Sequence, residues 1–294
     1  MTVVAQGVAQ VLTVGVLLGM IYTLVGLGMT LSLGVLGILN LTHGLAVVGG
    51  SILAFEVVRT WGLSVGVALA LSIPLGFVAG VVLHVGLVRR AQRVSPESGL
   101  LVLFGAMLLL QAVAVQVWRS DTRTLTLSFS EHLSSFAGVT VRTDYAVAAA
   151  AAAGLLLIIW AVIRFTMFGR AVQALSQHPD AARILGVNAD RYTTVVFGIS
   201  MALAASSGVL LAGVFPFSVQ TQTQWLAYAF IVVLLGGTGG VVNAAVGGLA
   251  LGMGQAVLNE LLPLTWVSVV VYGLLVLAMV ARGGGLSAAK ERAL

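Results

Sequence analysis

Two long stretches without any charged side chain constrain this sequence more than any other feature. No Asp, Glu, Lys or Arg occurs from Met1 to Phe55 or between Arg191 and Glu260. Each stretch is far longer than the ~20 apolar residues that cross the hydrocarbon core of a bilayer. Backbone groups inside a bilayer must pair with one another, and unbroken apolar runs exclude the alternating pattern of barrel strands. The sequence therefore predicts an all-α, polytopic transmembrane bundle.

Composition supports this fold class and excludes several kinds of site. Only 8% of the residues are charged, too few to cover the surface of a soluble domain. The absence of cysteine excludes disulfides and thiolate metal ligands. No histidine and carboxylate spacing suggests a metal site, and we expect no cofactor in this chain. The net charge of +5 is better explained by cytoplasmic arginines than by binding to nucleic acid.

Hydrophobic runs predict about eight or nine spans within a single transmembrane domain over residues 1–294, with bounds good to about four residues. They are predicted at 8–34, 43–58, 63–88, 100–118, 145–163, 193–214, 225–240, 243–260 and 264–281. Two glycine-rich breaks, at 34–44 and 236–240, could occupy corresponding positions in two halves of the chain. Breaks of this kind mark the transport path in many carriers.

The basic residues predict which loops face the cytoplasm. Of the fourteen Lys and Arg residues, ten lie in 89–99, in 164–192 or beyond residue 281. The positive-inside rule places those two loops and the C-terminus in the cytoplasm. Loops 119–143 and 215–224 then face the opposite side. No charged residue near the N-terminus determines on which side of the membrane it lies, so the sequence leaves that side undetermined.

Many of the 36 glycines recur at a spacing of four residues. Glycine costs about 1 kcal/mol relative to alanine inside a helix, but in lipid this spacing lets two helix backbones approach closely. We therefore interpret most of these glycines as packing residues. The pairs are Gly15 with Gly19, Gly62 with Gly66, Gly76 with Gly80 and Gly248 with Gly252.

The segment 164–192 is the longest predicted cytoplasmic loop. Pro179 suits the first turn of a helix, and Gly186 can adopt the left-handed backbone conformation that often ends one, so a short helix is predicted at 179–185. A helix this short is marginal in water and needs a neighbour to pack on. That neighbour is either the rest of this chain or the groove of another subunit.

Three segments resemble the permeases of branched-chain amino acid ABC importers of the LivH type. The stretch from Gly19 to Gly44 is similar to the N-terminal signature of that family, and Gly169 to Arg191 is similar to its cytoplasmic coupling loop. The glycine-rich run 234–252 is similar to its third signature. Ser206 and Ser207 depart from the family, which usually has glycine or alanine at these positions. The likeness extends over nearly the whole chain in the family's order.

The resemblance implies a non-enzymatic permease subunit in the cell membrane, surrounded by lipid. Its partners would be a second permease, either homologous or identical, two ATP-binding subunits, and an extracytoplasmic solute-binding protein. The ATP-binding subunits would dock on loop 164–192. The residues implied for this coupling are Gly169, Arg170, Ala182, Arg183, Ile184, Leu185 and Gly186. The only lysine, Lys290, lies outside any P-loop motif, so this chain is not the ATPase itself.

The polar and glycine residues of the two breaks are candidates for the translocation path. They are Asn40, Thr42 and His43 in the first break, and Gly236, Gly237, Thr238 and Gly239 in the second. Polar side chains at membrane depth either contact solute or satisfy backbone groups that the break has freed. For Asn40 and His43 both readings remain open.

The predicted function is therefore transport of branched-chain amino acids, energised by partner ATPases. A permease of the same family for urea or short amides is one alternative, and a self-sufficient channel or facilitator is another. The predicted membrane helices lack the buried carboxylate on which ion-coupled carriers usually depend, which favours energy from another subunit.

Overall fold

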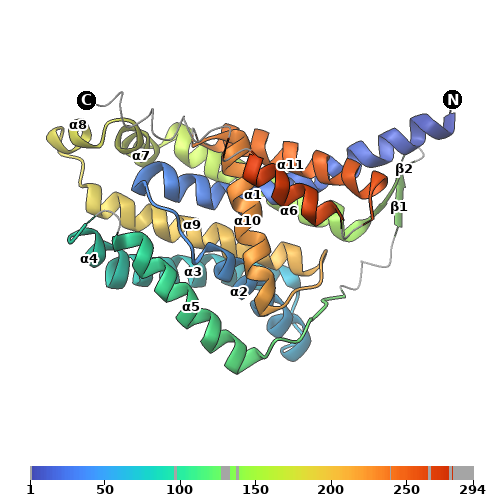
Figure 1. Cartoon of the computed structure of the whole chain (residues 1–294), viewed down its shortest axis with the longest axis horizontal. Helices are drawn as coiled ribbons and strands as arrows, with labels where there is room; N and C mark the ends of the chain where they lie inside the picture. The colour runs from blue at the N-terminus through green and yellow to red at the C-terminus, as the bar shows by residue number, and fades with distance from the viewer. Residues whose placement is uncertain are drawn as a thin grey trace.

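The computed structural model of the chain is almost entirely helical (Figure 1). It describes residues 2–95, 98–126, 133–136, 139–238, 240–263, 266–277 and 280. The longer helices are α1 (Thr2–Leu36), α2 (His43–Phe55), α3 (Val65–Leu83), α5 (Ser98–Trp118), α6 (Thr143–Phe165), α7 (Met167–Gln177), α9 (Ala189–Ala212), α10 (Gln222–Gly236) and α11 (Val241–Leu261). The short elements are the π-helices η1 (Glu56–Thr60) and η2 (His84–Val88), α4 (Arg89–Gln92), α8 (Pro179–Ile184), the 3-10 helix η3 (Val219–Thr221), and the paired strands β1 (Leu133–Phe136) and β2 (Val139–Arg142). A further apolar helix covers Trp266–Leu277.

The predicted fold class, an all-α membrane bundle, is confirmed. Within the described part of the chain, six helices are long and apolar enough to cross a bilayer: Gln6–Leu36, Val65–Gln92, Ser98–Trp118, Thr143–Phe165, Ala189–Ala212 and Val241–Leu261. The other three predicted spans correspond to shorter helices, namely α2, α10 and Trp266–Leu277. The count of eight or nine is thus approximate. The C-terminus beyond residue 280, which was predicted to be cytoplasmic, lies outside the described residues.

Helices α1 and α9 form the centre of the bundle. In the most apolar stretch of α9, 89% of the residues are buried against protein, compared with 61% in α1 and only 11% in α5. Helix α1 packs against α11, α9, α10 and α6, while α9 packs against α3 and α2. The outer helices α3, α5 and α6 expose rows of large apolar side chains, which suits contact with lipid tails or with another membrane subunit.

Three of the four predicted glycine pairs lie where helices touch. A β-carbon added to Gly19 on α1 would lie 2.8 Å from the Leu249 Cα on α11, and Gly252 on α11 lies directly against Gly19. Gly76 and Gly80 bring α3 equally close to α9. Gly62 and Gly66 are the exception, since a β-carbon added to Gly62 would meet open space and one at Gly66 would touch only Ser64.

The crossing of α2 with α9 is tight in both directions. A β-carbon on Gly50 of α2 would overlap the carbonyl oxygen of Ala205, and one on Gly208 of α9 would overlap that of Val47. The Ser51 hydroxyl donates to the Gly208 carbonyl oxygen at 2.8 Å. Such close backbone contact is available only to glycine.

The loops separate into two groups at opposite ends of the molecule (Figure 1). At the right, the hairpin end carries β1 and β2. Arg123, which follows α5 and precedes β1 in the chain, pairs with Glu56 at 3.5 Å and forms a two-way backbone bridge with Phe217. At the left, the α8 end carries α4, α7 and α8, and Arg89 pairs with Asp190 at 2.5 Å. The loops therefore alternate ends as predicted.

The start of α1 lies at the hairpin end of the molecule. Gln10 Nε2 donates to the Thr140 carbonyl oxygen at 2.5 Å, and Thr140 N donates to Gln10 Oε1 at 2.9 Å. Helix α1 then runs the length of the bundle, so that Leu36 lies near the α8 end (Figure 1).

Helices α2 and α10 both begin inside the bundle. Asn40, just before α2, contacts the sulfur of Met201, which lies halfway along α9. The Gln222 carbonyl oxygen at the start of α10 lies against Gly44, the second residue of α2. From this shared interior point α2 runs to the hairpin end, where Glu56 meets Arg123. Helix α10 crosses the bundle (Figure 1), and Thr238 just after it lies beside Gly34 near the end of α1.

The two breaks lie beside each other, because a β-carbon on Gly34 would lie 3.2 Å from the Thr238 carbonyl oxygen. Their correspondence in two halves of the chain stays a prediction. One expectation is corrected: Gln222, at the interior start of α10, is buried, although loop 215–224 was predicted to face outward. The sequence around Gln222 is polar, and polar residues that re-enter a bundle look the same in sequence as those in a solvated loop.

Candidate functional site: a polar vestibule at the α8 end

The polar residues of the first break are fully buried and hydrogen bonded. Asn40 Oδ1 accepts from Thr42 N at 3.1 Å and from Thr42 Oγ1 at 2.6 Å, while Asn40 Nδ2 donates to Met201 Sδ at 3.2 Å. His43 Nε2–H donates to the Val25 carbonyl oxygen at 2.9 Å. These contacts stabilise the turn between α1 and α2 and fix it to α9. A role for Asn40, Thr42 and His43 in the path stays a prediction.

The second break allows α10 to turn directly into α11. Gly237 and Gly240 have φ values of +87° and +110°, which L side chains rarely adopt. Gly236 lies so close to Asn243 that a β-carbon would overlap the Asn243 carbonyl oxygen. Thr238 is exposed at the tip of the turn, and Gly239 lies outside the described residues.

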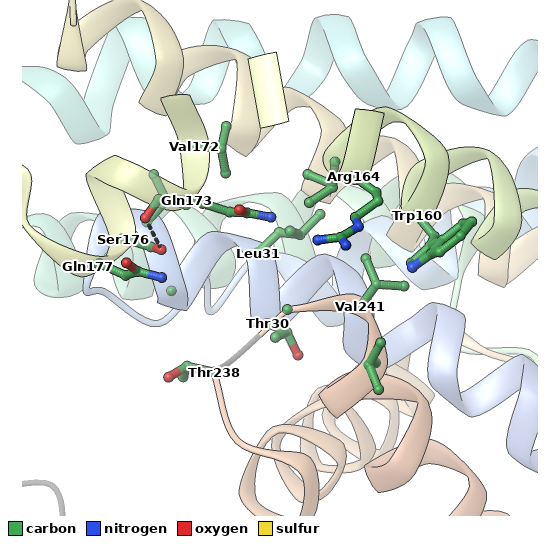
Figure 2. Close-up of a pocket in the computed structure, with 15 residues that line it drawn as sticks. Thr30, Leu31, Trp160, Arg164, Val172, Gln173, Ser176, Gln177, Thr238 and Val241 are labelled. Carbon is green, nitrogen blue, oxygen red and sulfur yellow. Dashed lines mark hydrogen bonds between the residues drawn. The ribbon is translucent and has the colours of Figure 1, made fainter. Parts of the chain in front are cut away.

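A polar cavity of about 610 Å³ opens beside this turn (Figure 2). We call it the vestibule. Its walls come from the last turns of α1, the end of α6, the inner face of α7 and the start of α11. It is lined by Thr30, Leu31, Gly34, Val35, Trp160, Ile163, Arg164, Val172, Gln173, Ser176, Gln177, Thr238, Gly240, Val241 and Val242. The vestibule therefore joins the predicted coupling loop to the second predicted break.

The chemistry of the vestibule is set by one cation and several neutral polar groups. Figure 2 shows Arg164 extending from the end of α6 over Leu31, with Gln173 and Gln177 reaching in from α7. No Asp or Glu is among the lining residues. A small molecule there would meet amide, hydroxyl and guanidinium groups, together with apolar surface from α1 and α11.

Sequence reasoning did not select Arg164 or the polar face of α7 as site residues. A sequence signal for a two-faced α7 was present: the buried residues Gly169, Val172 and Leu175 recur every three positions, as on one face of a helix, with polar residues between them. A neutral polar helix face is common on cytoplasmic loops, so the pattern alone does not distinguish a cavity wall from a solvated surface.

Helix α7 is attached firmly to the bundle. The Thr166 side chain caps its first turn by accepting from Gly169 N at 3.2 Å. A β-carbon at Gly169 would overlap the Ile163 carbonyl oxygen, so α7 folds back tightly on α6. Phe168 stacks on Tyr192 with ring centroids 5.6 Å apart, which connects α7 to α9.

The predicted helix at 179–185 is confirmed to within one residue as α8. Pro179 occupies its first turn, and Gly186 ends it with a φ of +86°. Gly186 N donates to the Arg183 carbonyl oxygen and Val187 N to that of Ala182, both at 3.0 Å, which satisfies the last carbonyl groups.

The residues predicted for coupling fall into two groups. Gly169 and Ala182 are buried and anchor α7 and α8. Ile184 and Leu185 are 86% and 83% exposed and protrude from the end of the molecule. Around them Arg183 pairs with Asp180 at 3.2 Å, and Arg170 is exposed on α7.

A second cavity, of about 710 Å³, lies between α2, α3 and α5 and is lined almost wholly by apolar side chains. Thr42 reaches it, and so does Ser72, whose hydroxyl lies 3.1 Å from the Ser206 hydroxyl across the α3–α9 contact. Ser206, where the family usually has a smaller side chain, thus has a hydrogen-bond partner inside the bundle. Glu56 is the one ionisable side chain among its lining residues, and no Lys or Arg lines it.

Within the described residues no group of three or more His, Asp or Glu side chains could hold a metal ion. No solved structure matches the chain.

Comparisons with known proteins agree with this architecture. The family described as "Branched-chain amino acid transport system / permease component" matches residues 11–280. The high-affinity branched-chain amino acid transport system permease protein LivH of Escherichia coli K12 is 29% identical, covering 92% of each chain. The corresponding permease BraD of Pseudomonas aeruginosa is 26% identical over 94% of each. The autoinducer 2 import system permease LsrC of Escherichia coli O9:H4 is 32% identical, but over only 43% of this chain and 39% of its own.

The family match extends over most of the chain, including both breaks, the vestibule and α8. The motifs that carry the resemblance all lie within the matched residues. The chain belongs to the permease family of branched-chain amino acid transport systems and is a non-enzymatic, multi-pass membrane subunit of an ABC importer.

Proposed function

We propose that this permease imports branched-chain amino acids and that partner ATPases drive it through α8. The names of the LivH and BraD relatives support the class of solute. The observation that carries the coupling role is the exposed apolar pair Ile184 and Leu185, held at the end of the molecule by the buried Ala182. Large apolar side chains exposed beyond the membrane spans usually mark a protein interface.

The sidedness follows from the arginines. The α8 end carries Arg89, Arg164, Arg170 and Arg183, so the positive-inside rule assigns this end to the cytoplasm. The hairpin end then faces outward and would receive solute from a binding protein. The second permease and the two ATP-binding subunits complete the assembly that we propose.

The packing of α8 suggests how motion would reach the membrane helices. Helix α8 lies between α7, which forms a wall of the vestibule, and α9, the most buried span. Asp190, in the first turn of α9, pairs with Arg89 at the start of α4. A displacement of α8 by the ATPases would therefore move the vestibule wall and the α4 loop together, as alternating access requires.

A pull-down from solubilised native membranes tests the coupling role. Leu185→Asp places a charge on the exposed knob, and Val94→Asp is the matched control, because Val94 is also 83% exposed but lies in the neighbouring loop. We expect wild type and Val94→Asp to recover a P-loop ATPase and a second permease. Leu185→Asp should lose the ATPase while keeping an unchanged melting temperature.

Other results would redirect the assignment. Recovery of the ATPase with Leu185→Asp would remove α8 as the docking element. Wild-type protein that purifies alone and passes solute in liposomes would instead support a self-sufficient facilitator. Uptake of urea or short amides in preference to leucine by the intact assembly would replace the solute class and leave the coupling role intact.

A further inference from the structure

Arg164 is a cation without a carboxylate partner in the described part of the chain. The ion pairs found there join Arg89 to Asp190, Arg123 to Glu56, Arg142 to Asp144 and Arg183 to Asp180. An arginine at the end of a span ordinarily extends toward lipid headgroups. Figure 2 shows the Arg164 guanidinium turned over Leu31, into the vestibule that it lines. Its charge is therefore available to a molecule in that cavity.

Neutral hydrogen-bonding groups surround the same space. Among the described residues, the side-chain amides of Gln173 and Gln177 and the hydroxyl of Thr238 make no hydrogen bond, although all three line the vestibule. Ser176 donates to the Gln173 carbonyl oxygen at 2.9 Å and keeps its lone pairs free to accept. These groups can orient a polar ligand without neutralising Arg164.

The helix ends give the vestibule two electrically different sides. Helix α11 begins at Val241, beside Arg164, and its free N–H groups add partial positive charge on that side. Helix α7 ends at Gln177 and α1 at Leu36, so two helix C-termini add partial negative charge on the other side. Helix α6 also ends beside Arg164, at Phe165, but the full charge of the guanidinium exceeds the partial charge of that end. A zwitterion with adjacent carboxylate and ammonium groups matches this separation.

We propose that the vestibule is an exit-side binding site for an α-amino acid, with the carboxylate held by the guanidinium of Arg164. The ammonium group faces the carbonyl ends of α7 and α1, and an apolar side chain packs on Leu31, Val172 and Val241 (Figure 2). The volume of about 610 Å³ is typical of small-molecule sites. This inference rests on the proposed function, because it takes the vestibule as the cytoplasmic mouth of the path.

Charge distinguishes this ligand from the neutral solutes of related permeases. Urea and short amides carry no carboxylate, so they would leave Arg164 unpaired and gain only neutral hydrogen bonds, which are weaker than charge-assisted ones. The apolar cavity between α2, α3 and α5 has no comparable cation among its lining residues. Arg142 lines a smaller cavity at the hairpin end but is paired with Asp144, so the vestibule is the cavity that offers a carboxylate an arginine without such a partner among the described residues.

Calorimetry on the purified full chain in detergent tests the site. The probes are L-leucine, L-leucinamide, which lacks the carboxylate, and urea. The variant is Arg164→Gln, and the control is Arg170→Gln, because Arg170 is exposed on α7 and does not line the vestibule. We expect leucine to bind wild type and Arg170→Gln equally. Arg164→Gln should bind leucine roughly 10-fold or more weakly, as removal of a charge-assisted pair implies.

The comparison of ligands keeps the test decisive even if Arg164→Gln folds poorly. Wild type should bind leucinamide at least about 10-fold more weakly than leucine and should not bind urea measurably. Equal binding of leucine and leucinamide, or no leucine binding by wild type, would overturn the inference. Wild type that recovers the ATPase but does not bind leucine refutes only this site, whereas leucine binding without ATPase recovery refutes only the proposed coupling.

Discussion

Adjacent glycines on α2 allow a stringent test of the α2–α9 crossing. Gly49 and Gly50 lie in the same helix, but a β-carbon on Gly49 would meet open space and one on Gly50 would overlap the Ala205 carbonyl oxygen. Each Gly→Ala change gains about 0.5–1 kcal/mol from the lower flexibility of alanine in a helix. Only the change at Gly50 must also separate two packed helices.

The cost at Gly50 follows from what the separation would disturb. Overpacking a tight contact costs about 1–3 kcal/mol. Moving α2 outward also stretches the bond from Ser51 to the Gly208 carbonyl oxygen, a further loss of about 0.5–1.5 kcal/mol. After the helix gain is subtracted, Gly50→Ala should lose about 0.5–4 kcal/mol of stability, while Gly49→Ala should gain up to about 1 kcal/mol.

Thermal unfolding in detergent, followed by size-exclusion chromatography, measures this difference. At about 2–4 °C per kcal/mol, Gly50→Ala should melt roughly 1–16 °C below wild type. Unfolding of membrane proteins in detergent is often irreversible, so the assay ranks the variants instead of giving equilibrium free energies. A Gly50→Ala protein as stable as Gly49→Ala would refute the close crossing and the assignment of these glycines to packing.

Two further substitutions test contacts at the breaks and at the α8 end. Asn40→Leu leaves the buried Thr42 N–H without its acceptor and should cost about 1–3 kcal/mol, measured by the same melting assay; an unchanged melting temperature would contradict the hydrogen bonding described for this turn. Asp190→Asn removes the ion pair with Arg89. The Asp190 side chain is 57% exposed and the Arg89 side chain 38% exposed, so water screens the pair and stability should fall by less than about 1 kcal/mol. Leucine uptake by the assembled importer should fall more clearly, and unchanged uptake would show that this pair does not link α9 to α4.

The features that were predictable from sequence are those set by local chemistry. The lack of charge over residues 1–55 and 192–259 required membrane helices, and the structure has them. Pro179 and Gly186 determine the two ends of α8 through backbone conformation alone, so the helix was predicted to within one residue. The glycine pairs on α1 and α11 pack on one another for the reason their spacing suggested.

The features that were not predictable depend on depth and on distant partners. Hydropathy gives the same signal for a helix that begins inside the bundle as for part of a full span, so the interior start of α10 at Gln222 was missed. For the turn before α2 the sequence left two possibilities, a loop or an unwound stretch within the membrane, and the structure has it inside the bundle. Arg164 was counted only as a topological charge, because its direction is set by how α7 folds back over α1. The short hairpin of β1 and β2 likewise depends on contact between Thr140 and Gln10, which lie 130 positions apart.

The interior start of α2 has a consequence for how the protein is made. Helices α2 and η1 form one unbroken helical stretch over 43–60, at the short end of the lengths that span a bilayer, so α2 depends on its neighbours for stable insertion. Its partner Gly208 on α9 follows Ser51 by 157 positions. At about 5–20 residues per second, the ribosome needs on the order of 10–30 seconds to supply that helix. During that interval α2 must wait beside α1 or the insertion machinery, and folding of this permease is complete only after α9 and α10 have been synthesised.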